Sequence, residues 1–279
     1  MNNRHFLRRV LATGSGRAGF AGLVLVVLLA LLGPLLSPNA PTAMISIPYD
    51  PPARGLPLGA DALGRDVLAR FLWGGASLLW MSVIAALLAV GVGTTMGLAA
   101  AYYRGITETL LMRLVDIQMA FPTTVLALLV ITMFGISEPL LVAVVGLSMA
   151  PSVARVIRGA TMAVVDQEYV QYARTIGFPV RKIIWRDILP NVTSPLLTEL
   201  GLRLMWSIAG IAALSFLGFG IQPPKADWGL MINENRNALA VQPWAVVIPI
   251  LGIALFTISG NLFAEAVART LGRTEGSSE

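Results

Sequence analysis

Six long stretches almost free of charge dominate this sequence. The length of each stretch is close to that of a helix that crosses a bilayer, which needs about 20 apolar residues. The chain is 56% hydrophobic and 13% charged, whereas a soluble domain carries about 25% charged residues. We therefore predict an all-α integral membrane protein with six transmembrane helices. The predicted spans are 18–36, 77–101, 114–134, 139–156, 195–219 and 244–268.

The first apolar stretch follows a basic N-terminal tail, MNNRHFLRRVLATGSGR, and signal peptides show the same order. This stretch is nearly long enough to span, and it ends in GPLLSPNAP, without a small-x-small cleavage site. A retained first helix is therefore the preferred interpretation, with a signal peptide as the alternative.

The distribution of basic residues predicts the orientation. They are concentrated before the first span, between the second and third, between the fourth and fifth, and after the sixth. The positive-inside rule places these segments, and with them both termini, in the cytoplasm. The loops 37–76 and 220–243 then face outside, and their proline and glycine predict ordered, largely non-helical structure with short helices. The net charge of +5 is a topology signal, and nucleic-acid binding is not expected.

Missing residue types exclude several kinds of site. The chain has no cysteine, and its one histidine, His5, lies in the polar tail, so zinc–thiolate sites and histidine dyads are not expected. A phosphate-binding loop needs G-x-x-x-x-G-K-[ST], and neither Lys182 nor Lys225 stands in such a sequence. We therefore predict that the chain is not an enzyme and holds no metal or cofactor. If its transport is driven by ATP, another chain has to hydrolyse the nucleotide.

Several charged residues lie near or within the predicted spans, where burial in lipid is costly, and four of them form two candidate pairs. Arg113 and Asp116 are three residues apart, and Glu199 and Arg203 are four apart, so each pair has the spacing of one helix face. We predict two ion pairs, with a role in gating or substrate contact as the alternative for the second. Methionine and tryptophan side chains could line an adaptable cavity or pack in the core: Met119, Met133, Met149, Met205 and Trp206.

The segment EYVQYARTIGFPVRKIIWRDILPN (168–191) is charged and differs from the spans. Its pattern predicts one helix over 168–176, a turn at Gly177, and a second helix that starts near Pro179 and ends at Pro190. The apolar residues of the segment follow one helical stripe: Ile176, Val180, Ile183, Ile184, Ile188 and Leu189. Such a helix either lies on the membrane surface or fits a groove of a partner protein.

The end of this segment, YARTIGFPVRKIIWRDILPN, resembles the cytoplasmic loop motif of ABC importer permeases, in the version of the dipeptide, oligopeptide and nickel family (DppC/OppC-type). PLGADALGRDVLARFLWG, LMRLVDIQMAFP, LSFLGFGIQPPKADWG and the asparagine of GNLFAEAV follow the order of that family. The resemblance covers about residues 8–270. The sequence departs from the pattern in three places: Gln171-Tyr172 replaces Glu-Ala, Asp187 replaces a histidine, and Ile211 replaces an acid.

The resemblance implies a type I ABC importer permease fold. Residues 1–76 would hold a cytoplasmic tail, the first transmembrane helix and an external loop, and 77–279 a five-helix core with a coupling helix at about 168–191. The residues implied in coupling to an ATPase are Ala173, Arg174, Gly177, Arg181, Lys182, Ile183, Ile184, Trp185, Arg186, Ile188, Leu189 and Pro190. The arginines and Lys182 would meet polar groups of the ATPase; for Trp185, anchoring at lipid headgroups is the alternative.

The implied function is that of a permease subunit in a binding-protein-dependent, ATP-driven importer of peptides or a related small solute. It would sit in a prokaryotic cytoplasmic membrane with a second permease subunit, two ATP-binding subunits or domains that carry ATP and Mg²⁺, and an extracytoplasmic solute-binding protein. A self-sufficient secondary transporter or channel is the alternative. It would need an ion-coupling carboxylate near the bilayer centre, and Asp116 and Glu199 are expected nearer the cytoplasmic ends.

Overall fold

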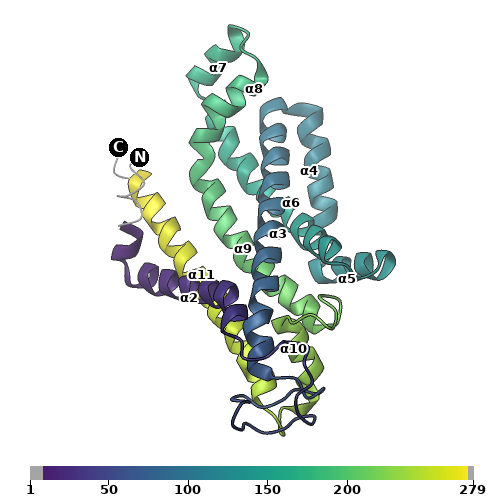
Figure 1. Ribbon diagram of the computed structural model, residues 1–279. Helices are drawn as coiled ribbons and strands as arrows, with labels where there is room; N and C mark the ends of the chain where they lie inside the picture. The colour runs from purple at the N-terminus through teal and green to yellow at the C-terminus, as the bar shows by residue number, and fades with distance from the viewer. Residues whose placement is uncertain (1–8, 276–279) are drawn as a thin grey trace.

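The computed structural model describes residues 9–275 and consists mainly of long helices (Figure 1). Five of them are long and apolar enough to cross a membrane, and a bent pair makes a sixth candidate. The described helices are α2 (Gly14–Leu36), α3 (Val67–Tyr103), α4 (Gly105–Met119), α5 (Thr123–Phe134), α6 (Glu138–Val165), α7 (Glu168–Thr175), α8 (Val180–Ile183), α9 (Thr193–Phe216), α10 (Trp228–Asn235) and α11 (Trp244–Glu275). His5 lies outside the described residues.

The third predicted span, 114–134, is not one straight helix. It is divided between α4 and α5, whose axes meet at 87°. Pro122 explains the break, because proline lacks the N–H that would continue the helix and disfavours helical geometry at the residue before it. The chain turns at Ala120 and Phe121, and α5 begins directly after the proline. The remaining five predicted spans are confirmed as helices, with α3 starting ten residues earlier than predicted, at Val67.

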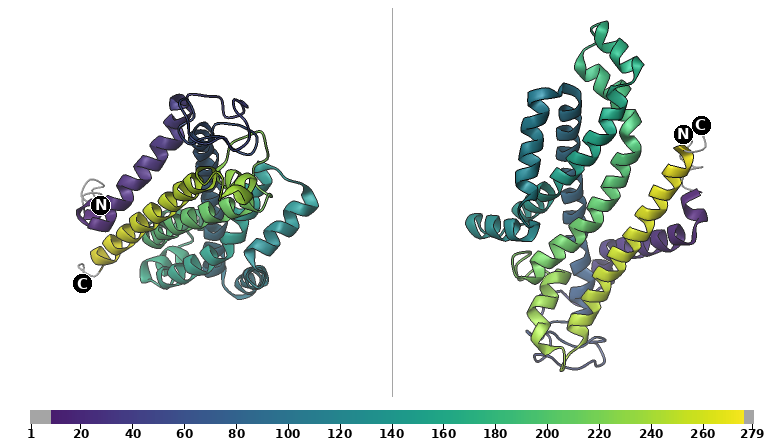
Figure 2. Two further views of the ribbon diagram at one scale, coloured as in Figure 1. Left: turned by 90° about the horizontal axis from the view of Figure 1, so that it is seen from below. Right: turned by 180° about the vertical axis from the view of Figure 1, so that it is seen from behind.

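Helices α3 and α6 form the centre of the fold and approach each other through glycine. A Cβ at Gly93 would lie 2.5 Å from the Val153 side chain, and one at Gly97 would lie 2.7 Å from the carbonyl oxygen of Ala154. Helices α2 and α11 make a second pair, side by side in the view from below (Figure 2), where a Cβ at Gly19 would lie 2.5 Å from the Phe263 nitrogen. Small residues therefore set the closest helix packing, as is common in membrane proteins.

The two ends of the molecule differ (Figures 1 and 2). One end carries the charged segment with α7 and α8. The other carries the irregular loop 37–66, which has only isolated β-bridges, together with α10. The carboxylate of Asp66 accepts a hydrogen bond from the Leu68 N–H at the start of α3, and Asp227 does the same for Leu230 at the start of α10. These caps fix where both helices begin.

Candidate functional site

The charged segment begins with α7, which ends in a left-handed turn at Gly177. Gly177 has φ +78°, a conformation that glycine adopts at little cost. The N–H of Phe178 donates to the carbonyl of Ala173 and that of Gly177 to the carbonyl of Arg174, at 3.1 and 3.0 Å. These two bonds are the Schellman arrangement, which satisfies the last carbonyls of a helix. The predicted turn at Gly177 is therefore confirmed, with a hydrogen-bonding reason for its position.

The sequence predicts that the second helix of the segment ends at Pro190, and this prediction is wrong. After α8 the chain forms a π turn (Ile184–Ile188) and a 3₁₀ turn (Leu189–Val192), and these lead directly into α9. Pro190 is accommodated because it stands at the start of the 3₁₀ turn, where its missing N–H is not required. The segment 180–216 is therefore one continuous helical rod with altered hydrogen bonding near its start.

The apolar residues of the segment are divided between the protein interior and the surface. Ile183 and Ile188 are fully buried, in one cluster with Val153 and Ile157 of α6. Ile184 and Leu189 pack partly against the same cluster. Trp185, in contrast, is 64% exposed. The sequence had placed this stripe on a membrane surface or in a partner's groove, but these four residues pack against the chain's own core, and Trp185 stays outside.

The basic residues of the segment are also divided. The guanidinium of Arg174 lies 4.0 Å from the centre of the Tyr102 ring and donates a 2.8 Å hydrogen bond to the Tyr102 carbonyl. Arg174 therefore holds α7 to the end of α3. Arg181, Lys182 and Arg186 are exposed, and the described part of the chain provides no carboxylate for them. The outer surface of the segment, consisting of these three residues and Trp185, is cationic and is called the basic face below. Ala173 is buried and Pro190 exposed.

The structure corrects one of the two predicted ion pairs. Asp116 pairs with Arg155 of the neighbouring helix α6, at 2.5 Å, and not with Arg113. Contact between α4 and α6 brings Arg155 within reach, so a cross-helix pair forms in place of the pair within α4. Glu199 and Arg203 do pair within α9, where Nε and Nη2 of Arg203 lie 2.9 and 2.8 Å from Oε2 of Glu199. Both side chains of this second pair are largely buried.

A cavity of about 420 Å³ lies where the α4–α5 bend faces α6 and α9. Of the methionines and the tryptophan considered for such a cavity, Met119, Met149 and Trp206 line it, whereas Met205 packs against Gly260 on another side of α9 and Met133 is exposed. The complete lining is Gln118, Met119, Phe121, Thr123, Thr124, Ser148, Met149, Ser152, Arg203, Trp206, Ala209, Gly210 and Ala213. The bend that interrupts the third span thus creates the wall of this cavity.

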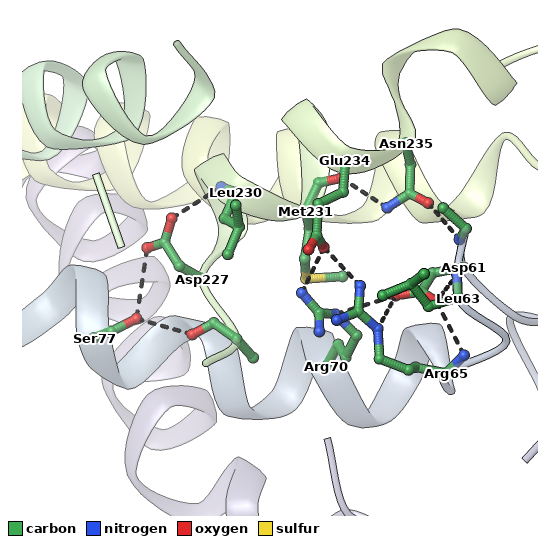
Figure 3. Close-up of polar contacts among 12 residues, drawn as sticks. Asp61, Leu63, Arg65, Arg70, Ser77, Asp227, Leu230, Met231, Glu234 and Asn235 are labelled. Atoms are coloured by element: carbon green, nitrogen blue, oxygen red, sulfur yellow. Dashed lines mark hydrogen bonds and ion pairs between the residues drawn. The ribbon is translucent and has the colours of Figure 1, made fainter. Parts of the chain in front are cut away.

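At the opposite end, two arginines and two acids form a buried ionic cluster (Figure 3). Oε2 of Glu234 accepts from Arg65 and Arg70, at 2.8 and 2.7 Å, and Oδ2 of Asp61 lies 2.7 Å from Nε of Arg65 and 3.4 Å from Nε of Arg70. The side chain of Arg70 is 0% exposed. The charges in GADALGRDVLAR are a local signal for such a cluster. No local pattern, however, pairs Arg65 and Arg70 with Glu234, which lies 169 and 164 residues further along the chain.

Asp227 lies beside this cluster and is fully buried (Figure 3). Burial raises its pKa from 3.8 to about 6, because removal from water penalises the charged carboxylate. The N–H of Leu230 and the hydroxyl of Ser77 donate to the carboxylate, at 3.0 and 3.5 Å, and oppose part of that rise. Asp227 thus joins α3 to α10 with a group whose charge changes in mildly acidic conditions.

Comparison with known proteins identifies the family. Residues 93–273 match the family described as binding-protein-dependent transport system inner membrane component. The chain belongs to this family. The glutathione transport system permease protein GsiD of Pectobacterium atrosepticum is 33% identical over 96% of this chain and 88% of its own length. A putative peptide transport system permease protein of Brucella suis is 33% identical over 95% of this chain and 89% of its own length.

Chains of two solved ABC transporters have the same fold as this chain. The MetNI methionine ABC transporter in an inward-facing conformation has a chain that matches with a TM-score of 0.53, at 16% identity, over 71% of this chain and 96% of that chain. An amino acid ABC transporter crystallised with histidines matches at 0.50 and 21% identity, over 73% of this chain and 94% of that one. The type I permease fold is confirmed, and the chain is an integral inner-membrane protein. Membership of this family favours the predicted importer subunit over a self-sufficient transporter or channel.

Proposed function

We propose that this chain is a permease subunit that carries small peptides inward across a prokaryotic cytoplasmic membrane, with both termini in the cytoplasm. The names of its relatives, which refer to glutathione and peptide transport, support the substrate class. The observation that carries the proposal is structural: the basic face lies on the same continuous rod, 180–216, as the α9 side chains that line the cavity.

The segment 168–192 is suited to receive a force from an ATP-binding partner. Ile183 and Ile188 bind it to α6, and Arg174 binds it to α3, so it moves with the membrane helices rather than independently. Trp185 and the three exposed cations form the surface that a cleft on the partner would grip, because amphipathic helices are commonly recognised in grooves. ATP and Mg²⁺ bind to that partner, and this chain performs no chemistry on the cargo.

The complete importer in this proposal contains a second permease subunit, two ATP-binding subunits or domains, and an extracytoplasmic solute-binding protein. The loop 37–66 and α10 lie at the end away from the basic face, which is where a solute-binding protein would dock. Closure of the ATP-binding partners would push on the basic face, and the rod would pass this movement to the cavity. Cargo would reach the cavity from outside and leave it to the cytoplasm.

Replacement of Trp185 in the reconstituted importer tests this proposal. We expect Trp185→Ala to weaken co-purification with the ATP-binding partner by about tenfold or more, since truncating a central interface tryptophan costs about 2 kcal/mol, and to reduce peptide uptake in parallel. Trp244→Ala is the matched control, because Trp244 is 42% exposed and begins α11 at the other end of the molecule. If both variants retain full co-purification and uptake, the basic face does not couple to the partner.

A further inference from the structure

One cation stands in the wall of the cavity. Among the lining residues, all of which the structure describes, Arg203 alone is charged. Nε and Nη2 of its guanidinium both lie against a single oxygen of Glu199, at 2.9 and 2.8 Å. Glu199 is buried and does not line the cavity. The acid therefore holds Arg203 in place from behind, and the pair stands at the cavity as a fixed, oriented group.

The guanidinium has donors to spare. It carries five N–H groups, and one carboxylate oxygen engages one N–H from each of two nitrogens. Among the side chains that the structure describes, and the backbone of residues 9–275, Nη1 of Arg203 has no hydrogen-bond partner. A planar guanidinium whose position is already fixed loses little further freedom when it binds a second carboxylate, and it matches carboxylate geometry well. An oxygen-bearing anionic group is therefore the ligand that suits this part of the wall.

The facing helices supply acceptors. The hydroxyls of Ser148 and Ser152 donate to the carbonyls of Val145 and Met149, at 2.8 and 2.9 Å, so their oxygens keep lone pairs for another donor. Gln118 donates through Nε2 to the Leu147 carbonyl at 2.8 Å, and its amide oxygen stays available in the same way. Donors on α9 thus face acceptors on α4 and α6. A peptide, which carries a carboxylate and N–H groups, has the complementary pattern.

The rest of the wall is apolar and adaptable. Met119, Phe121, Met149 and Trp206 provide thioether and aromatic surface, which accommodates side chains of different shapes. The volume of about 420 Å³ falls within the range of about 300–1,000 Å³ found for small-molecule pockets. A few fixed polar groups in an otherwise apolar wall are typical of a site that binds one backbone pattern with varied side chains.

We infer that this cavity is a peptide subsite in which Arg203 binds the C-terminal carboxylate of the cargo and Ser148, Ser152 and Gln118 accept its N–H groups. The inference rests on the proposed function and extends it, because it assigns a preference for free peptide acids to the permease itself. Glu199 is a positioning residue in this site: it fixes the guanidinium and does not touch the cargo.

The experiment compares a dipeptide, Ala-Phe, with its C-terminal amide in proteoliposomes that contain the full importer. Each peptide is supplied at a concentration that saturates the solute-binding protein, so that the permease determines the difference. We expect the wild type to take up the free acid at least about tenfold faster per ATP hydrolysed. Arg203→Gln should lower uptake of the acid to the level of the amide, leave uptake of the amide unchanged, and keep the ATPase activity stimulated by the loaded binding protein.

Two further variants make the test decisive. Glu199→Gln combined with Arg203→Gln removes the cation without leaving a buried, unpaired acid, and it should give the same loss of discrimination if the single variant is unstable. Arg113→Gln is the control, because Arg113 is exposed on α4 and has no ion pair in the described chain. It should behave as the wild type.

Other outcomes overturn the inference. If Arg203→Gln lowers uptake of the acid and of the amide equally, or lowers neither, Arg203 does not bind the carboxylate of the cargo. Loss of the second permease subunit from the purified complex means that this surface is a subunit interface. In these cases the proposed function stands, since the wild type still imports peptide. A wild-type importer that is assembled and hydrolyses ATP but takes up neither peptide refutes the proposed function itself.

Discussion

Individual charged residues in this chain differ widely in what they contribute. Exposed pairs such as Arg104–Asp166 and Arg269–Glu265 are shared with solvent, and pairs of this kind contribute about 0–1 kcal/mol. Arg70, in contrast, is enclosed, and its positive charge depends on the acids beside it. A buried charge that loses its partner costs about 3–5 kcal/mol. The charges most sensitive to replacement are therefore the buried ones, in this ionic cluster and in the Glu199–Arg203 pair of α9.

Asp227 gives a prediction at the scale of one residue. Its pKa in the folded protein is about 6, above the usual 3.8. The folded state therefore binds the proton more tightly than the unfolded state, and stability falls as pH rises from about 4 to 6. The full difference is roughly 3 kcal/mol, at about 1.4 kcal/mol for each pKa unit. In Asp227→Asn the side chain still caps the Leu230 N–H and stays neutral, so the stability of this variant should not fall between pH 4 and 6 through this group.

The measurement is thermal unfolding of both proteins in detergent between pH 4 and pH 8. The melting temperature of Asp227→Asn relative to that of the wild type should rise with pH through 4–6 and be constant above 7. Parallel curves for the two proteins across the whole range would show that Asp227 does not titrate in this window.

At the scale of elements, contact between α3 and α6 depends on glycines that face the neighbouring helix. In Gly97→Ala the new Cβ would meet the Ala154 carbonyl oxygen at 2.7 Å and the Arg158 nitrogen at 2.9 Å, and backbone atoms cannot move aside cheaply. We expect a loss of about 1–3 kcal/mol, seen as a melting temperature lowered by about 3–10 °C. Gly91→Ala, in the same helix with open space around it, should leave that temperature unchanged or raise it.

If Gly97→Ala and Gly91→Ala have the same melting temperature, Gly97 is not required for the close approach of α3 and α6. A co-purification assay would then show whether Gly97 matters for assembly instead. The pair of variants is informative because both change a helical glycine to the same residue, and they differ only in what surrounds the new methyl group.

The sequence predicts elements well where the information is local. Gly177 predicted the turn, and the apolar periodicity predicted a stripe on one helix face, because cap geometry and helical spacing are set within a few residues. The periodicity did not predict what covers the stripe: Ile183 and Ile188 are buried against α6 of the same chain, and not on a membrane surface or in a partner's groove. The effects of Pro122 and Pro190 on their helices were harder to predict from the sequence. The first breaks a span and the second is absorbed in a 3₁₀ turn, and the neighbouring turns decide between these outcomes. The cross-helix partner of Asp116 depends on tertiary contact that no local pattern contains.

At the scale of the whole molecule, the distribution of charge predicts that α7 faces the cytoplasm and the loop before α11 faces outside. The native chain has no cysteine, so single cysteines report their positions without background. Tyr172 on α7 is 67% exposed and Val241 before α11 is 71% exposed, which makes them a matched pair. In intact cells, a membrane-impermeant maleimide should label Val241→Cys and not Tyr172→Cys.

Permeabilised cells provide the control, because both cysteines should then react at similar rates. Labelling of Tyr172→Cys in intact cells, with Val241→Cys protected, would reverse the orientation and place the basic face outside, where no ATP-binding partner could reach it. Equal labelling of both in intact cells would also contradict the predicted topology.

The ionic cluster at the outer end has a consequence for chimeric permeases. Asp61, Arg65 and Arg70 lie in the loop and at the beginning of α3, whereas Glu234 lies on α10, far along the chain. Exchange of the first outer loop and the start of α3 between two homologues would separate the incoming arginines from the acid with which they pair, unless α10 is exchanged with them. Domain swaps intended to alter the docking of a binding protein should therefore cut outside both segments and transplant all four residues together.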